Sequence, residues 1–405
     1  MTHNTMETLH HFCKHLPKIE LHAHLNGSMR ESTLVELARE RNVSLPAKLL
    51  QHEAEHHDPD KEALFFNTKP RSLEECFEIF GYIPSCVNDV AALKRITHEV
   101  LDDFASDNVV YLELRTGPKM LLIDHSLPEL GYCTKKQYIE IILEIMALFE
   151  KQEHNRYEHE RSTSDGNSAR LPMIPRLIIS VDRSGTVEQA QQNIDIAVQL
   201  TQSHSKFIVG VELGGNPTRN DFRMFEPVFR KARDRGLNVS IHCGEIPTVQ
   251  NDVDSSDPVL KAANEEALAI LKFRPDRLGH ALLLSNSLMD VLEQQPIPIE
   301  VCPTSNVMTL ELALHHGGNL IDGLKKHPQL KQWIEKKYPF SINTDDSGIF
   351  STNLTKEYLL VAKACGLCEV DLSDIVIESV GHIFDKSIRK VLKEIISERV
   401  YTRIM

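Results

Sequence analysis

The sequence lacks several features that would each place the protein in a particular class. It has no apolar run long enough to span a membrane, and its first residues lack the basic and apolar regions of a secretory signal. Its eight cysteines are scattered over 405 residues, which favours free thiols in a reducing compartment over a disulfide framework. It also lacks an excess of positive charge, with a formal net charge of −13. These absences predict a cytosolic protein that does not bind a membrane. They also argue against binding to a nucleic-acid polymer, because proteins that bind nucleic acids carry basic patches.

What is present is a globular composition, 41% hydrophobic and 25% charged. Eight segments rich in Val, Ile and Leu are predicted as strands, and helical patterns separate most of them. Strands of this kind, alternating with helices, indicate a parallel sheet that is covered on both faces. Eight such units predict an α/β fold, a closed (β/α)₈ TIM barrel with additional helices, in a single domain over residues 1–405. The predicted strands cover residues 16–24, 108–115, 176–182, 207–213, 237–243, 276–280, 297–302 and 338–344.

Two local patterns refine this prediction. Residues 150–170 are charged, poor in apolar residues and contain Ser-Thr-Ser-Asp-Gly-Asn-Ser, which indicates a mobile polar surface insertion after a helix that ends near residue 149. Ser28 and Glu31 have capping-box spacing before the helix predicted for residues 32–41. A helix therefore starts soon after the first strand, and a helix start is a natural anion site.

Histidines and carboxylates gather where the predicted strands end. His22 and His24 are two residues apart on one strand, so their side chains project from the same face. His242 ends the fifth strand, and Asp345 follows the eighth. Because the strand ends of a (β/α)₈ barrel meet at one mouth, these four residues can supply three nitrogens and one oxygen to a single metal ion. The set suits one Zn²⁺ per chain, with a position left for a water that the metal makes available as hydroxide.

Three more polar residues follow the same strands. Glu245 can be a proton donor, His280 can stabilise or orient the hydroxide, and Asp346 can act as a base or bind the substrate ring. Taken singly, His280 can equally be a core histidine, and the pair Asp345-Asp346 can cap a helix. Their joint occurrence at the ends of strands favours a catalytic site.

Residues 52–56 match the H-E-x-x-H pattern of zinc peptidases. That motif needs a helix anchored in a core, whereas its neighbours here include Gln51, His57, Asp58 and Pro59. A solvated polar loop is the favoured interpretation, and a zinc peptidase stays a remote alternative.

Five short motifs, taken together, resemble the adenosine deaminase family of metal-dependent hydrolases. They are H-A-H-L-N-G-S at 22–28, S-I-H-C-G-E at 240–245, R-L-G-H-A at 277–281, C-P-T-S-N at 302–306 and N-T-D-D at 343–346. The resemblance implies a (β/α)₈ barrel with one zinc ion. It implies His22, His24, His242 and Asp345 as zinc ligands, Glu245 as the proton donor to purine N1, His280 as the catalytic histidine, and His24, Gly215 and Asp346 as substrate contacts.

Within that family, the chain is most similar to the adenosine deaminase-like proteins that act on N6-methyl-AMP. Asn26 stands where classical adenosine deaminases have an aspartate near the ribose 5′-hydroxyl, and an amide does not repel a 5′-phosphate. Residues 112–119, L-E-L-R-T-G-P-K, are similar to a motif of that subfamily. The resemblance implies nucleotide contacts from Thr116, Gly117, Pro118 and Lys119, with charge for the phosphate from Lys119, and a further contact from Asp182.

Two departures leave the substrate open. Pro84 stands where the subfamily has a substrate-contacting histidine, and Glu212 replaces a usual aspartate. We expect hydrolysis of N6-methyl-AMP to IMP and methylamine by a monomer whose partner is a small purine nucleotide. The alternatives are an adenosine deaminase that acts on the free nucleoside and a non-catalytic binding relative.

Overall fold

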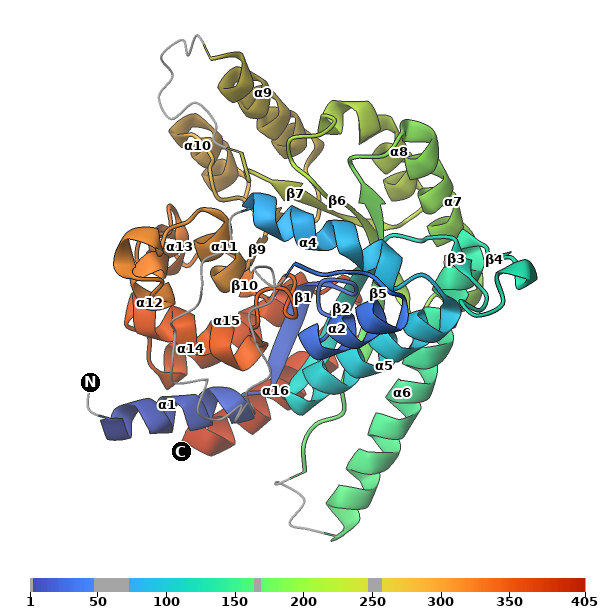
Figure 1. The fold of residues 1–405 in the computed structure, drawn as a ribbon. Helices are drawn as coiled ribbons and strands as arrows, with labels where there is room; N and C mark the ends of the chain where they lie inside the picture. The colour runs from blue at the N-terminus through green and yellow to red at the C-terminus, as the bar shows by residue number, and fades with distance from the viewer. Residues whose placement is uncertain (1–2, 47–72, 164–168, 247–256, 405) are drawn as a thin grey trace.

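The centre of the computed structural model, which describes residues 3–46, 73–163, 169–246 and 257–404, is a sheet of eight parallel strands (Figure 1). Their order in the sheet follows the chain, as repeated right-handed βαβ units require. Each predicted strand is present, with ends within two residues of those expected, which confirms the (β/α)₈ barrel. The strands are β1 Lys18–His24, β2 Val109–Thr116, β5 Ile174–Asp182, β6 Ile208–Gly214, β7 Asn238–Cys243, β8 Arg277–His280, β9 Ile299–Val301 and β10 Phe340–Ile342.

The barrel closes between its first and last strands, at the residues predicted to bind metal. The backbone N–H of Asp345 donates to the carbonyl of His22 at 2.8 Å, and the N–H of His24 donates to the carbonyl of Asp345 at 3.0 Å. The Asn343 side chain accepts from the Leu21 N–H at 3.0 Å just below them. Closure therefore fixes two segments of the chain, 322 residues apart at Leu21 and Asn343, in one register.

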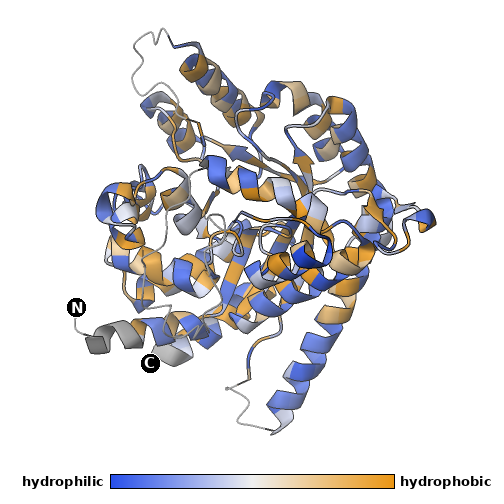
Figure 2. Cartoon of the chain, viewed as in Figure 1, coloured by the Kyte–Doolittle hydropathy of each residue, from blue (hydrophilic) through white to orange (hydrophobic). Residues whose placement is uncertain are grey.

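The helices surround this sheet with their apolar faces toward it, and their outer faces are largely hydrophilic (Figure 2). A small hairpin of β3 Leu121–Leu122 and β4 Tyr132–Cys133 follows β2. The helices are α1 His3–His15, α2 Glu31–Glu40, α4 Leu73–Cys86, α5 Val90–Ser106, α6 Lys135–Thr163, α7 Val187–His204, α8 Phe222–Asp234, α9 Pro258–Phe273, α10 Asn286–Gln294, α11 Pro303–Thr309, α12 Leu320–Leu324, α13 Leu330–Glu335, α14 Leu354–Cys365, α15 Glu369–Ser379 and α16 Arg389–Ile404.

Two local predictions are wrong. The helix predicted to end near residue 149 continues as α6 to Thr163, so residues 150–163 form the hydrophilic outer half of a projecting helix (Figures 1 and 2). Buried Glu153 binds Arg156 and Arg170 there, ion pairs that the composition does not reveal. The capping box is also absent, because α2 begins at Glu31 with Arg30 at its N-cap and Ser28 lies two residues too early.

Three further predictions concern the cysteines, membrane-spanning helices and residues 52–56. All eight cysteines are free thiols, as expected. In the described part of the chain, no helix is both long and apolar enough to cross a membrane. The H-E-x-x-H segment at 52–56 lies outside the described residues.

Candidate active site

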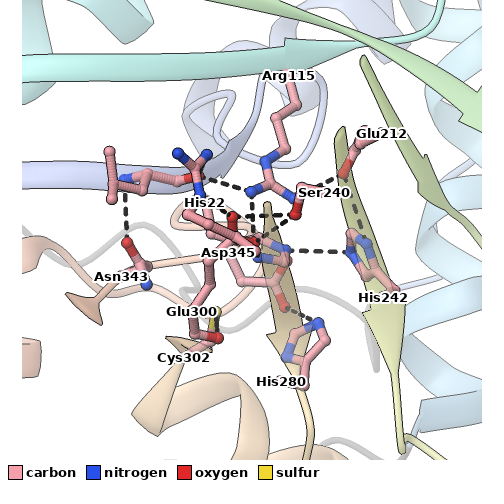
Figure 3. Close-up of polar contacts among 12 residues, drawn as sticks. His22, Arg115, Glu212, Ser240, His242, His280, Glu300, Cys302, Asn343 and Asp345 are labelled. Carbon is pink, nitrogen blue, oxygen red and sulfur yellow. Dashed lines mark hydrogen bonds and ion pairs between the residues drawn. The ribbon is translucent and has the colours of Figure 1, made fainter. Parts of the chain in front are cut away.

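Four predicted ligands converge at the mouth of the barrel. The Nε2 atom of His22 lies 3.1 Å from Nε2 of His242 and 3.4 Å from Oδ1 of Asp345 (Figure 3). It also lies 3.3 Å from Nε2 of His24. His24 Nε2 lies 3.5 Å from the same Asp345 oxygen. Three imidazole nitrogens and one carboxylate oxygen therefore face a common point, and the roles of these residues as ligands stay a prediction.

A second set of contacts orients these rings from behind. His22 Nδ1 lies 2.7 Å from Oε2 of Glu300, and His242 Nδ1 lies 3.1 Å from the Leu213 carbonyl. Since each ring uses Nδ1 in this way, its Nε2 is left to face the common point. Ser305 Oγ donates to Asp345 Oδ2 at 2.7 Å, which leaves Oδ1 facing the rings.

Buried ion pairs support this arrangement from inside the barrel, and we call them the ion layer. Arg115 binds Glu212 at 2.7 Å and also pairs with Glu300, while Arg277 pairs with Glu300 and Glu113 (Figure 3 shows the Arg115 side). All five side chains are at most 1% exposed. Because Glu300 also binds His22, the ion layer is connected directly to the cluster at the mouth.

Electrostatics differ from ring to ring. Burial lowers the pKa of His24 and holds that of His242 well below its usual value, so both rings are neutral, as metal ligands must be. In His22, burial and Arg115 lower the pKa, but hydrogen bonds with Asp345 and Glu300 outweigh them and raise it to about 9. The pKa of Asp345 lies well below its usual value, because contacts with the imidazoles outweigh its burial.

The three predicted catalytic residues face this cluster. His280 Nε2 lies 3.9 Å from Oε1 of Glu245 and 3.9 Å from Oδ2 of Asp345. Burial, with Asp345 nearby, raises the pKa of Glu245 to about 8, so this carboxyl carries a proton at neutral pH. Burial raises the pKa of Asp346 well above its usual value, and its Oδ1 has no hydrogen-bond partner in the described part of the chain. The site thus holds a protonated carboxyl group, that of Glu245, beside the cluster.

Two glycines leave room for these side chains where the backbone passes close to them. A Cβ on Gly279 would lie 2.9 Å from the His22 ring, and a Cβ on Gly27 would overlap the Asp346 carboxylate. His280 and Asp345 both have positive φ, 59° and 64°, a conformation that is uncommon for residues with a side chain. Both turn the chain sharply at the end of a strand, and backbone strain of this kind clusters at functional sites.

A cavity of about 920 Å³ opens above the cluster, within the range of small-molecule pockets. The predicted substrate residues His24, Asn26, Thr116, Gly117, Lys119, Asp182, Gly215 and Asp346 line it. Pro118 does not line it, so the structure gives no support to that predicted contact. Helix α4 covers one side with Phe77, Phe80 and Pro84.

Sequence reasoning missed several supporting residues. Tyr138 on α6 hydrogen bonds with Thr116 at 2.8 Å and with Asn26, so one hydroxyl anchors two predicted contacts. Glu300 was also missed, although a lone carboxylate inside the apolar run of residues 297–302 is a detectable signal. No signal in the sequence marks Tyr138.

Comparisons with known proteins identify relatives of this chain. A family model described as "Adenosine deaminase" matches residues 17–399. An Arabidopsis thaliana N6-mAMP deaminase is 34% identical over 365 residues, which cover 87% of this chain and 88% of that protein. A human N6-methyl-AMP deaminase is 29% identical and covers 92% of this chain and 90% of that protein. The crystal structure of Arabidopsis ADAL complexed with IMP superposes with a TM-score of 0.72 at 31% identity, covering 96% of this chain and 99% of that one.

The (β/α)₈ barrel, with a buried His/Asp cluster that could hold a metal, and the family match together identify the class of protein as a hydrolase. The chain belongs to the adenosine deaminase family. It is accordingly an aminohydrolase, and its family is metal-dependent.

Proposed function

We propose that the protein is a zinc-dependent deaminase that converts N6-methyl-AMP and water to IMP and methylamine. The observation that carries this proposal is the convergence of His24, His242 and Asp345 on Nε2 of His22, at 3.1–3.4 Å, with His24 3.5 Å from Asp345. Zinc bonds of about 2.0–2.2 Å put tetrahedral ligands about 3.4 Å apart, so the residues present fit this ion. When bound, zinc would supply the Lewis acidity that lets water attack near neutral pH.

The chain's own residues account for the remaining steps. Water adds to C6 of the purine while Glu245, protonated at neutral pH, gives its proton to N1. Asp346, whose buried Oδ1 has no partner among the described residues, binds the purine ring, and Gly215 lines the cavity beside it. The proton that water loses passes to N6, the C6–N6 bond breaks, and the amine leaves as the remaining hydroxyl proton returns to Glu245.

The cavity favours a phosphorylated substrate. Lys119 lines it without a hydrogen bond or ion pair in the described part of the chain, and burial lowers the pKa of its ammonium group. A phosphate would offset that burial cost with a charge-assisted hydrogen bond. Asn26, held by Tyr138, presents an amide to the same cavity and adds no negative charge.

One observation favours the second candidate, adenosine. Pro84 lines the cavity from α4 and can donate no hydrogen bond to a phosphate or ribose. The two candidates differ in the 5′ group alone, so kinetics with both substrates separate them.

The test measures kcat/KM for N6-methyl-AMP, AMP and adenosine, with metal analysis of the same samples. We expect N6-methyl-AMP to be preferred, and Lys119→Met to lower kcat/KM for it by about 10- to 100-fold, the value of one hydrogen bond to a charged group. Activity on adenosine should change far less. A preference for adenosine would reject the nucleotide assignment.

Metal content separates the deaminase from the zinc peptidase. We expect His22→Ala to lose zinc, whereas the double variant His52→Ala/His56→Ala should keep both zinc and deaminase activity. Loss of zinc in the double variant would instead favour the H-E-x-x-H site.

A further inference from the structure

The two ring nitrogens of His280 face different surroundings. Nε2 faces the reacting centre, 3.9 Å from both Glu245 and Asp345, which is too far for a direct hydrogen bond. Nδ1 faces away and lies 3.1 Å from the side-chain Nδ2 of Asn306. Within the described part of the chain, Asn306 is therefore the one hydrogen-bond partner of this ring.

The position of one proton decides what His280 can do. A neutral imidazole carries a single N–H, on one ring nitrogen or the other. With the proton on Nδ1, Nε2 presents a lone pair and can accept a proton. With the proton on Nε2, the ring presents a hydrogen-bond donor to the reacting centre instead.

The Asn306 amide selects between these tautomers. Its Nδ2 is a donor and can bond only to an Nδ1 that carries no proton. The other amide atom, Oδ1, is buried without a partner among the described residues. If the amide were turned over, its NH₂ group would take the place of Oδ1 and be buried without a partner. A buried N–H without a partner is rarer in proteins than an under-satisfied carbonyl, which favours the orientation with Nδ2 toward His280.

The chain that carries Asn306 is fixed by contacts of the two residues before it. The preceding residue, Ser305, donates to Asp345 at 2.7 Å, and the N–H of Thr304 donates to buried Glu357 at 2.9 Å. Asn306 itself is 1% exposed. The amide therefore cannot withdraw from His280 without disturbing the contact to a predicted ligand.

We propose that Asn306 is a positioning residue that holds the proton of His280 on Nε2, so that this imidazole donates a hydrogen bond to the oxygen that attacks purine C6. The role in catalysis rests on the proposed function. The tautomer is a property of the folded chain and can be measured whether or not the protein turns over a nucleotide.

The test is ¹⁵N NMR of histidine-labelled protein as purified, with His280→Ala used to assign the His280 signals. We expect the wild-type Nδ1 to show the chemical shift of an unprotonated nitrogen and Nε2 that of a protonated one. A wild-type ring protonated on Nδ1 would overturn the proposal without any further variant.

Asn306→Asp replaces the donor with an acceptor and should move the proton to Nδ1. We expect kcat to fall by about 10- to 100-fold with KM changed by less than about threefold, as for loss of one hydrogen bond to the transition state. Asn286→Asp, the same chemical change at an exposed position of α10, is the matched control and should alter neither the tautomer nor kcat. If Asn306→Asp lowers the melting temperature but leaves the His280 shifts unchanged, Asn306 only packs, and the proposal fails.

Discussion

The ion layer and the mouth of the barrel are both buried, yet their carboxyl groups differ in whether an arginine is paired with them. In the ion layer, each carboxylate has an arginine partner, and Arg115 and Arg277 both bind Glu300. Burial alone would raise the pKa of Glu300, but the two guanidinium groups hold it well below its usual value. Glu300 therefore stays charged at any physiological pH.

At the mouth, the carboxyl groups have no arginine or lysine partner in the described part of the chain. Burial consequently raises the pKa of Glu245 to about 8 and that of Asp346 well above its usual value. Protons there can be given up, while the layer below holds His22 in place through Glu300. Under the proposed function, the barrel separates the residues that position the site from those that transfer protons, and each prediction below changes one of the two regions.

The largest effect is expected at the mouth, from Glu245→Gln. This variant keeps the shape of the side chain but has no proton to give to N1, so kcat should fall by about 10²–10⁴-fold. Zinc content should not change, because the ligand set is intact. In the wild type, activity should fall as the pH rises above about 8, since an acid with a raised pKa loses its proton there. Less than a tenfold loss in kcat would rule out Glu245 as the donor.

In the ion layer, Arg115→Met should lower stability rather than impair proton transfer. Removing one partner of a buried pair leaves Glu212 without its arginine, which costs about 3–5 kcal/mol. Urea denaturation measures the loss, and the double variant Arg115→Met/Glu212→Gln should recover part of it.

The matched control is Arg30→Met, which breaks the exposed pair with Asp103, whose side chains are 44% and 46% exposed. Exposed pairs contribute at most about 1 kcal/mol. Equal losses from Arg30→Met and Arg115→Met would show that burial does not distinguish the ion layer.

The mouth was far more predictable from sequence than the ion layer. Histidines and carboxylates at strand ends form local patterns, and the period of a strand places His22 and His24 on one face. The pairing of Arg277 with Glu113 joins residues 164 positions apart, and it follows only from the register of the closed barrel. Sequence therefore revealed the groups predicted to react but not the charges that hold them.

The extension of α6 was missed for a related reason. Composition reports only that residues 150–163 do not pack into a core, and both a solvated loop and a projecting helix satisfy that condition. The ion pairs of Glu153 with Arg156 and Arg170 decide between them, and Arg170 lies beyond the end of the helix. Local composition cannot anticipate a contact of this kind.

The smallest effect is expected from Glu357→Gln, which tests a buried carboxyl that belongs neither to the ion layer nor to the mouth of the barrel. Glu357 accepts hydrogen bonds from the Thr304 N–H and the Thr352 hydroxyl, and burial raises its pKa to about 7. The raised pKa means that the folded state loses stability as the pH rises from about 4.5, where the unfolded chain ionises, to about 7, where the folded one does. Glutamine can keep both contacts without the charge, because its oxygen accepts from the Thr304 N–H and its NH₂ group donates to the Thr352 hydroxyl oxygen.

The variant should therefore match the wild type near pH 4.5 and exceed its stability at pH 8, by at most about 3 kcal/mol for a shift of this size. Melting temperatures at the two pH values measure the difference. A variant that is less stable than the wild type at pH 8 would show that ionised Glu357 stabilises α11. Buried carboxylates outside the ion layer would then also hold the mouth in place, and positioning would not be confined to the paired charges.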